Sequence, residues 1–372
     1  MKISRITAWQ MDLPLAEPYW LSGGRLRFDK LDTTFVRIET DDGLSGWGEA
    51  CPWGHSYLPA FGGGVRAGLE LLAPALIGLD PCALTTINRA MDNVLPGHPY
   101  AKSALDVACW DILGQFSRMP LWRLFGGSEA VPVAINSSIS TGTPDEMLAR
   151  IEKAAALGYQ AHSAKIGGSE PCADIARIEA ISAGLPRGHS VTFDVNRAWA
   201  SGTAIRVLNS VGARDWVEQP CETLDQCAHV AANVPQPIML DECMHTFSDH
   251  LEAWRRGACQ GVKVKPNRVG GLTKAKQIVE FGCSVGWQMH IEDTGGSALA
   301  DTAAIHLAAA TPHEHRLASW LGHAHLAVDP VAGLGARNVD GQAAPPDAPG
   351  LGIIPDVTRW GEPVAVYQNR AV

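Results

Sequence analysis

Apolar and polar positions follow a regular rhythm from about residue 131 onward. Short apolar runs alternate with stretches of helical periodicity, and the runs lie near residues 131–138, 161–166, 190–194, 215–218, 237–241, 261–265 and 286–292. Strand-length runs separated by single helices indicate parallel β/α units. Such a series predicts a (β/α) barrel, whose active site lies at the carboxyl ends of the strands.

A doubly wound sheet is the competing fold for this pattern. It would place a glycine-rich phosphate turn after its first strand, and residues 134–138 read Ala-Ile-Asn-Ser-Ser. Thr143 as an N-cap, followed by Pro144 at the first helical position, predicts the start of the first barrel helix. The barrel is therefore the preferred prediction.

The first 120 residues show strands first and helices afterwards. Residues 2–12 and 33–40 alternate like strands, and a hairpin turn is expected at Asp41-Asp42-Gly43. Helical periodicity then runs from about residue 65 to 117. This order of elements indicates a separate α+β domain.

The tail beyond about residue 322 is rich in glycine, proline, alanine and aspartate, and it is too irregular for a barrel helix. We expect it to return and pack on the N-terminal domain. The chain is thus predicted to be an α/β protein with a capping domain over residues 1–125, a barrel over 126–322 and a returning tail over 323–372.

Composition narrows the class of protein. The chain has 372 residues, of which 46% are hydrophobic, and a net charge of −9, so we expect no nucleic acid as a partner. Its nine cysteines are scattered without a C-x-x-C pair, which favours reduced thiols. The start of the chain does not resemble a signal peptide, and no apolar run approaches the roughly 20 residues of a membrane span. A cytoplasmic enzyme with no membrane partner is the prediction.

Three predicted strands in succession end in a carboxylate. Asp194, Glu218 and Asp241 each follow an apolar run, with no histidine or cysteine in register. Because the tips of neighbouring parallel strands share one mouth, this set of oxygen ligands favours Mg²⁺ over Zn²⁺. The alternative is that each acid caps the helix that follows it, which three consecutive cases make less attractive.

Two lysines bracket these acids along the chain. Lys165 and Lys265 stand at the tips of the flanking strands, where burial and a nearby divalent cation would lower the pKa of each amine enough for a general base. The alternative is a solvated lysine paired with an acid. Lys263 has the same orientation as Lys265 by strand alternation, so only the tip position favours Lys265.

Such a site suits the removal of a proton α to a carboxylate. A metal on the substrate carboxylate would stabilise the developing negative charge, and lysines on opposite faces would allow racemisation or elimination. A barrel aldolase forming a Schiff base on either lysine is a rival enzyme class, and a catalytically inactive homologue is a third reading.

Further polar residues near the strand tips have open roles. Asn196 either contacts a ligand or supports a turn. Asp293, with Thr294 beside it, either supports the metal ligands from behind, contacts the substrate or caps a helix.

The motifs at these positions resemble the enolase superfamily, in its mandelate racemase/muconate lactonizing enzyme branch. The matching segments are Asp194-Val-Asn196, Glu218-Gln-Pro220, Asp241-Glu242 and Lys265-Pro-Asn-Arg-Val-Gly-Gly271, together with the helix over residues 100–114. The resemblance implies one Mg²⁺ per subunit and a homo-oligomer. It also implies a modified (β/α)7β TIM-like barrel, capped by an α+β domain that the N-terminus and the C-terminal tail form together.

Substrate specificity is expected from two loops of the capping domain, at residues 17–24 and 51–64. Many relatives carry Lys-x-Lys at the second strand, whereas Ser163-Ala-Lys165 keeps only the second lysine, and Ala318-Ser-Trp320 lacks the acid expected of dipeptide epimerases. The single-lysine pattern and the stretches 97–102 and 349–355 look most similar to the group that acts on proline derivatives, namely cis-3-hydroxy-L-proline dehydratases and hydroxyproline betaine 2-epimerases.

The resemblance implies a small amino-acid carboxylate as the substrate, and dehydration of cis-3-hydroxy-L-proline to pyrroline-2-carboxylate as the preferred reaction. Lys165 would take the α-proton and Lys265 would protonate the departing hydroxyl. Epimerisation of a betaine is the alternative, because aromatic faces attract a quaternary ammonium. The candidate aromatic side chains, which also serve as plain loop packing in the simplest reading, are Trp20, Trp53, Tyr57 and Trp320.

Overall fold

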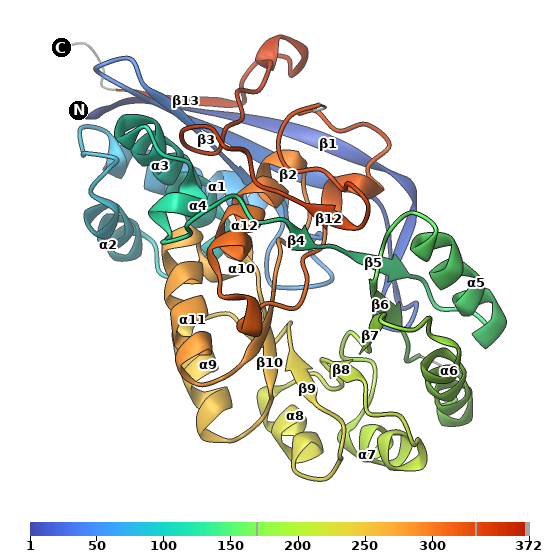
Figure 1. The fold of residues 1–372 in the computed structure, drawn as a ribbon. Coiled ribbons are helices and arrows are strands. Elements are labelled where there is room, and N and C mark those ends of the chain that lie inside the picture. The colour runs from blue at the N-terminus through green and yellow to red at the C-terminus, as the bar shows by residue number, and fades with distance from the viewer. Residues whose placement is uncertain (169, 332, 369–372) are drawn as a thin grey trace.

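A parallel barrel forms the body of the molecule (Figure 1). The computed structural model describes residues 1–168, 170–331 and 333–368. In this part of the chain one parallel sheet has the order β11-β10-β9-β8-β7-β6-β5. Its strands are β5 (Asn136–Ile139), β6 (Ala161–Lys165), β7 (Ser190–Asp194), β8 (Trp216–Glu218), β9 (Ile238–Leu240), β10 (Gly261–Val264) and β11 (Gln288–Ile291).

The segment 316–319 closes the barrel. Arg316 forms an isolated parallel β-bridge with Met289 of β11, and Ser319 forms one with Ile135, the residue before β5. The Ser319 amide donates to the Ala134 carbonyl over 2.8 Å. The two edges of the sheet therefore meet through this short eighth strand, as the (β/α)7β prediction requires.

Helices follow the strands around the outside of the barrel. They are α5 (Pro144–Ala155), α6 (Pro171–Gly184), α7 (Ser201–Ser210), α8 (Leu224–Ala231), α9 (Phe247–Arg255), the short α10 (Pro266–Val269), α11 (Leu272–Ser284) and α12 (Ala298–Ala310). The predicted start at Thr143 is confirmed, because its side chain and that of Glu146 form a reciprocal capping box.

The capping domain is an antiparallel sheet covered by helices. Its strand order is β13-β1-β2-β3, so the C-terminal strand β13 pairs with β1 and the tail returns as predicted. The elements are β1 (Ile3–Leu21), β2 (Leu26–Thr40), β3 (Ser45–Ala50), α1 (Gly62–Leu76), α2 (Leu84–Val94), α3 (Pro99–Ser117) and β13 (Ala365–Gln368). Shorter connecting elements are α4 (Leu121–Leu124), β4 (Val133–Ala134) and β12 (Gln342–Ala343). The domain boundaries at residues 125 and 322 stay predictions.

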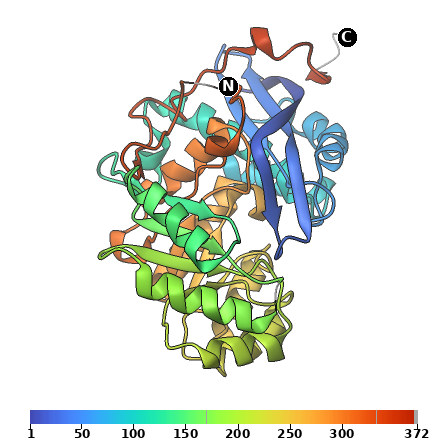
Figure 2. The same cartoon turned by 90° about the vertical axis from the view of Figure 1, so that its right-hand side faces the viewer.

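The β1–β2 hairpin is longer than the sequence pattern predicted. Residues 17–21 belong to β1 rather than to a loop, with Tyr19 opposite Phe28 after a register shift that follows Pro14. The hairpin extends alongside the barrel (Figure 2). Its tip packs backbone to backbone on the loop after β6, where a Cβ atom on Gly23 or Gly168 would collide with the other glycine.

Glu49 joins the capping domain to the barrel. From β3 its buried carboxylate accepts hydrogen bonds from the Ser297 amide at 2.9 Å, the Ser297 hydroxyl at 2.6 Å and the Thr33 hydroxyl at 2.8 Å. Burial raises the pKa of Glu49 to about 7. The junction therefore contains a carboxyl group that titrates near neutral pH.

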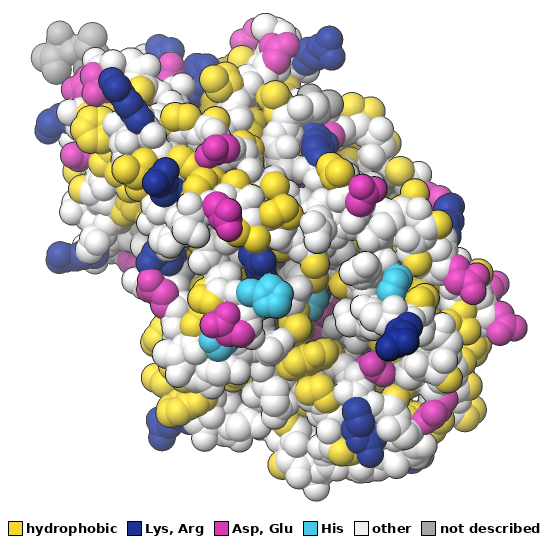
Figure 3. Space-filling model, in the orientation of Figure 1, with side chains coloured by type: hydrophobic (Ala, Val, Ile, Leu, Met, Phe, Trp, Pro, Cys, Tyr) yellow, Lys and Arg dark blue, Asp and Glu magenta, His cyan; other side chains and the backbone are white. Residues whose placement is uncertain are grey.

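Charged side chains of both signs share the face of the molecule that Figure 3 draws, with basic and acidic residues interspersed. Across the described ranges, none of the helices combines the length and the apolar character that crossing a bilayer demands.

Candidate active site

The strand tips bring the predicted acids into one mouth. Lys165, Asp194 and Glu218 end the adjacent strands β6, β7 and β8, and each is in register with the next. Asp241 and Lys265 directly follow β9 and β10. The three acidic side chains are almost fully buried, with exposed fractions of 2%, 1% and 1%.

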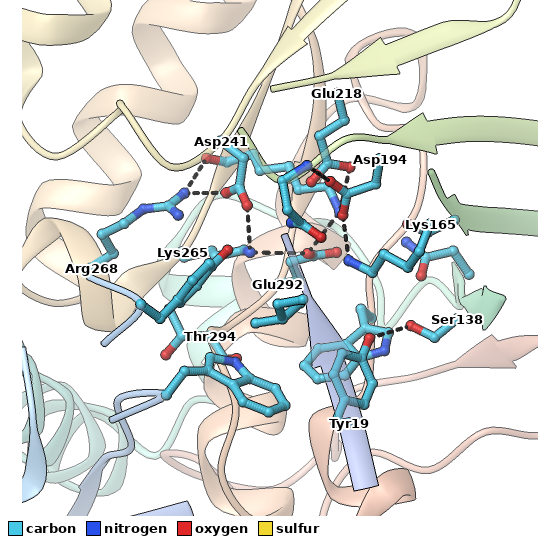
Figure 4. Close-up of a pocket in the computed structure, with 18 residues that line it drawn as sticks. Tyr19, Ser138, Lys165, Asp194, Glu218, Asp241, Lys265, Arg268, Glu292 and Thr294 are labelled. Atoms are coloured by element: carbon cyan, nitrogen blue, oxygen red, sulfur yellow. Dashed lines mark hydrogen bonds and ion pairs between the residues drawn. The ribbon is translucent and has the colours of Figure 1, made fainter. Parts of the chain in front are cut away.

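The two lysines stand on opposite sides of these carboxylates, separated by three strands (Figure 4). Lys165 Nζ forms a close ion pair with Asp194 Oδ2. Lys265 Nζ lies 3.0 Å from Asp241 Oδ2 and 3.7 Å from Glu292 Oε1. A small molecule held at the carboxylates would therefore have an amine on each flank.

Three further charged residues, to which the sequence analysis gave no role, complete the mouth. Lys263 Nζ lies 3.1 Å from both Glu218 Oε2 and Glu292 Oε1. Arg268 donates from Nη2 to Asp241 Oδ1. Strand alternation already gave Lys263 the orientation of Lys265, and Arg268 lies within the motif over residues 265–271, but neither was assigned a role. Nothing in the sequence pattern distinguished Glu292 from an ordinary polar residue after a strand.

The electrostatics differ from one carboxylate to the next. Burial, together with the neighbouring Asp194 and Asp241, raises the pKa of Glu218 well above its usual value. Burial also acts on Asp241, but Arg268 and Lys265 outweigh it and hold the pKa of that carboxyl far below its usual range. The mouth therefore contains one acid that is firmly ionised and one that resists ionisation.

The expected lowering of the Lys165 pKa does not arise from burial alone, and its dependence on a bound cation stays a prediction. Burial does act in that direction, but the charge of Asp194, aided by Tyr19 and Glu218, outweighs it and raises the pKa of the amine. The sequence argument had weighed desolvation and a cation without the acid that lies directly across the strand pair. Lys165 is thus a protonated partner of Asp194 until something else takes up that carboxylate.

The capping domain supplies the aromatic wall of the cavity. The lining residues from the cap and the segment 316–320 are Tyr19, Leu21, Trp53, Tyr57 and Trp320. Tyr19 OH lies 2.7 Å from Ser138 Oγ of β5, which links the hairpin to the barrel mouth. Trp53, Tyr57 and Trp320 are therefore where the prediction placed them.

The structure corrects the placement of Trp20. It lies outside the cavity, 47% exposed, with Arg27 over its ring, because period-2 alternation turns Tyr19 and Leu21 inward and the residue between them outward. The sequence analysis had treated this stretch as a loop, in which no such alternation holds.

Asp293 is also placed away from the cavity, in a supporting position. Its carboxylate accepts from the Asn267 side chain at 2.8 Å and from the Thr294 amide at 2.7 Å. Burial raises its pKa to about 7. Its carboxylate also accepts from the Asn267 amide in the first turn of α10 over 3.2 Å, so Asp293 supports that turn from behind the cavity, whereas Thr294 itself lines the cavity.

Asn196 lines the cavity and connects two acids. Its amide N–H donates to Asp194 Oδ1 over 3.0 Å, and its side chain donates to Glu242 Oε1 over 3.1 Å. Tyr57 OH donates to the same Glu242 oxygen over 2.8 Å. Asn196 and Gln219 adopt φ values of 43° and 37°, a region that non-glycine residues rarely occupy and that is found often at functional sites.

The donor set fits a hard divalent cation. Within the described ranges, no three acidic, histidine or cysteine side chains converge into a coordination sphere by themselves, since each expected ligand faces a cationic side chain. Glu218 pairs with Lys263 through Oε2 at 3.1 Å, whereas its buried Oε1 has neither a hydrogen bond nor an ion pair among these residues. A buried carboxylate oxygen without a partner, beside two further carboxylates, favours an additional cation.

Comparison with known proteins agrees with this geometry. The family model of the mandelate racemase/muconate lactonizing enzyme N-terminal domain matches residues 8–126, and the enolase C-terminal domain-like model matches residues 146–359. A TIM-like barrel with an α+β cap, bearing acids on successive strand tips, defines the class. The chain belongs to the enolase superfamily, in its mandelate racemase/muconate lactonizing enzyme branch.

Individual relatives cover nearly the full chain. The cis-3-hydroxy-L-proline dehydratase of Roseibium aggregatum is 40% identical, over 99% of this chain and 100% of the relative. The hydrophobic dipeptide epimerase of Enterococcus faecalis is 30% identical, over 83% and 88%. A solved enolase-superfamily structure from Roseovarius nubinhibens ISM, complexed with magnesium, is 69% identical with a TM-score of 0.97, over 99% of this chain and 100% of that chain.

Proposed function

We propose that the protein removes the α-proton of a proline-derived carboxylate with the help of Mg²⁺, and that its reaction is the dehydration of cis-3-hydroxy-L-proline to pyrroline-2-carboxylate. The observation that carries this proposal is the pair of lysines on opposite flanks of the three carboxylates. The 40% identity with a cis-3-hydroxy-L-proline dehydratase supports the choice of substrate.

Asp194, Glu218 and Asp241 are the proposed Mg²⁺ ligands. Their burial and the unpaired Oε1 of Glu218 support this role, and the similar protein from Roseovarius nubinhibens is a magnesium complex. Bound Mg²⁺ would stabilise the second negative charge that develops on the substrate carboxylate as the α-proton leaves.

Lys165 is the proposed base and Lys265 the proposed acid. In cis-3-hydroxy-L-proline the hydroxyl and the α-hydrogen lie on opposite faces of the ring, so elimination needs one group on each face. Lys165 Nζ would accept the α-proton, the Cα–H electron pair would form the C=C bond, and the C–O bond would break as Lys265 donates a proton to the hydroxyl. The enamine would then tautomerise to pyrroline-2-carboxylate.

The remaining cavity residues would bind and orient the ring. Trp53, Tyr57 and Trp320 line the cavity with apolar surface, and Tyr19 closes it through Ser138. Asn196 and Thr294 add polar groups at the rim of the carboxylate cluster. In this proposal the cap excludes water and the barrel carries the proton transfers. A homo-oligomer and a cytoplasmic location stay predictions.

Epimerisation of a proline or hydroxyproline betaine is the second candidate. The specific observation in its favour is the aromatic wall, in which the rings of Tyr19 and Trp53 lie 5.0 Å apart and those of Trp53 and Trp320 lie 6.4 Å apart. Such a wall suits a quaternary ammonium. The same two lysines would then exchange the α-proton on both faces without loss of water.

Proton NMR in D₂O with Mg²⁺ separates these reactions. The substrates are cis-3-hydroxy-L-proline, its trans isomer, L-proline and 4-hydroxyproline betaine. We expect pyrroline-2-carboxylate from the first alone. If the betaine is inverted or deuterated at Cα while cis-3-hydroxy-L-proline is not turned over, the proposed reaction becomes epimerisation and dehydration is rejected.

A further inference from the structure

Three cysteines gather beside the loops that carry two of the proposed Mg²⁺ ligands. Cys221 lies shortly after Glu218 at the end of β8, and Cys243 lies shortly after Asp241 at the end of β9. Cys227 belongs to α8, between these two loops in the sequence. The thiols of Cys221 and Cys243 both hydrogen-bond to the thiol of Cys227 and raise its pKa. We call these three residues the thiol cluster.

The thiol cluster combines buried and accessible members. All nine cysteines of the chain are free thiols, so none of the three is in a disulfide. Cys221 and Cys227 are fully buried, whereas Cys243 is partly exposed. A small oxidant that arrives from solvent therefore meets Cys243 first, with Cys227 beside it. An accessible cysteine next to a second cysteine is typical of a site that forms a reversible disulfide.

The side chain of Gln219 connects the thiol cluster to a proposed metal ligand. Its Oε1 accepts hydrogen bonds from the Asp241 amide over 2.8 Å and from the Cys243 thiol over 3.5 Å. Its Nε2 donates to the Cys221 carbonyl over 2.9 Å and to the Cys227 sulfur over 3.6 Å. One buried amide group thus holds the loop that begins with Asp241 against the loop after β8.

A disulfide between Cys227 and Cys243 would disrupt this amide bridge. Bonded sulfur atoms lie about 2 Å apart, much closer than two thiols in contact. Pulling the two sulfur atoms together would draw both of them away from the side chain of Gln219. Gln219 would then no longer fix the Asp241 backbone, and supporting contacts of this kind tune the affinity of a metal site.

We propose that the thiol cluster is a redox modification site, in which hydrogen peroxide oxidises Cys227 and Cys243 to a disulfide that weakens Mg²⁺ binding. The Cys243 sulfur attacks the peroxide, the O–O bond breaks, and a sulfenic acid and one water form. The Cys227 sulfur then attacks the sulfenic sulfur, and the S–O bond breaks as the S–S bond forms and a second water leaves. The two thiols lose two electrons, which reduce the peroxide to water.

The disulfide does not depend on the reaction proposed for the strand tips, whereas its effect on Mg²⁺ rests on the proposed ligand role of Asp241. Two measurements keep these parts separate. Peptide mapping by mass spectrometry without reductant, after treatment of the full chain with hydrogen peroxide, tests the disulfide. Calorimetric titration of the reduced, the oxidised and the dithiothreitol-treated protein with Mg²⁺ tests its effect.

Three variants accompany both measurements. Cys243→Ser removes the partly exposed sulfur, and Cys227→Ala removes its buried partner. Cys172→Ser, at an exposed cysteine of α6 outside the thiol cluster, is the matched control. Thermal melting of each variant checks that it folds.

We expect the Cys227–Cys243 disulfide in the wild type and in Cys172→Ser. In both, oxidation should lower Mg²⁺ affinity by about 10-fold to 100-fold, the usual effect of losing a supporting contact at a metal site, and dithiothreitol should restore it. The folded Cys243→Ser and Cys227→Ala variants should neither form this disulfide nor lose affinity.

The proposal is overturned if the oxidised wild type lacks this disulfide, contains one between Cys221 and Cys227 in its place, or keeps its Mg²⁺ affinity once the disulfide has formed. An equal loss of affinity in the folded Cys243→Ser variant would overturn it as well. Failure of the reduced wild type to bind Mg²⁺ would contradict the proposed metal site and with it the effect on Mg²⁺, while the peptide map would still decide whether the disulfide forms.

Discussion

The two flanks of the catalytic mouth hold their lysines in different ways. Among the described residues, Asp194 is the one acid that forms an ion pair with Lys165. Lys265 lies in a network in which Asp241 and Glu292 are its partners. One amine depends on a single acid, whereas the other is held by two.

This difference suggests why one lysine would act as the base and the other as the acid. Asp194 is a proposed Mg²⁺ ligand, so metal binding would draw off the charge that keeps Lys165 protonated. Glu292, at 3.7 Å from Lys265, is not among the proposed ligands and would remain an ion-pair partner of that amine after the metal binds. The predictions below test this asymmetry, from the largest effect on turnover to the smallest.

Loss of the Lys165 amine should have the largest effect. Lys165→Ala removes the proposed base, and we expect dehydration to slow by about 10²–10⁴-fold with near-normal folding, since a positioned general base contributes an acceleration of this size. Steady-state kinetics on cis-3-hydroxy-L-proline measures the loss. Lys153→Ala, on a barrel helix away from the mouth, is the matched control and should retain activity.

Replacing Glu218 should weaken the metal site between the two flanks. Glu218→Gln keeps the shape of the side chain and removes its charge, so Mg²⁺ affinity is expected to fall by about 100-fold or more, in line with the sensitivity of metal sites to ligand changes. The Mg²⁺ dependence of the rate and direct calorimetry both report it. Glu222→Gln, at an acid that is 60% exposed, should leave Mg²⁺ affinity unchanged.

A methyl group at Gly168 should disturb the Lys165 flank alone. Gly168→Ala brings a Cβ atom into the backbone of Gly23 and displaces the hairpin that carries Tyr19. We expect kcat/KM to fall by about tenfold, because the cap no longer closes this side and the ring is less well positioned. Gly188→Ala carries the same positive-φ strain in open space, so equal losses in the two variants would rule out the hairpin contact as the cause.

Titration of Glu49, at the junction of cap and barrel, should change the free energy of unfolding more than it changes turnover. Its folded-state pKa of about 7 exceeds the ordinary value of 4.5, so its contribution to stability is full below pH 4.5 and is lost as the pH rises through 7. Relative to Glu49→Gln, which does not titrate, the wild type should lose about 3 kcal/mol over this window. Melting curves of both proteins from pH 4.5 to 8 measure it, and parallel pH profiles would contradict it.

The barrel and its acids were predictable because the successive strands β6 to β10 each end in, or are directly followed by, a charged residue, so the strand tips at Asp194 and Glu218 follow from local sequence. The length of the β1–β2 hairpin was not predictable from the sequence. Residues 17–21 contain a glutamate and a proline, which are typical of a loop, and only their pairing with β2 makes them part of a strand. Hence Trp20 was chosen where Tyr19 lies in the cavity.

Charge relationships across strands were harder to predict than positions along them. The raised pKa of Lys165 arises from Asp194 on the neighbouring strand, 29 residues away along the chain. Glu292 and Arg268 reach the mouth from separate segments, and only the closed barrel brings them to Lys263 and Asp241. Interactions of this kind depend on tertiary contacts that no local pattern specifies.

Proton NMR of the Lys265→Ala variant with cis-3-hydroxy-L-proline and Mg²⁺ in D₂O tests the central asymmetry most directly. With Lys165 intact and the acid removed, the account predicts slow deuterium incorporation at Cα and no pyrroline-2-carboxylate. Dehydration at the wild-type rate by this variant, or α-deuteration that persists in Lys165→Ala, would contradict the assignment of base and acid to the two flanks.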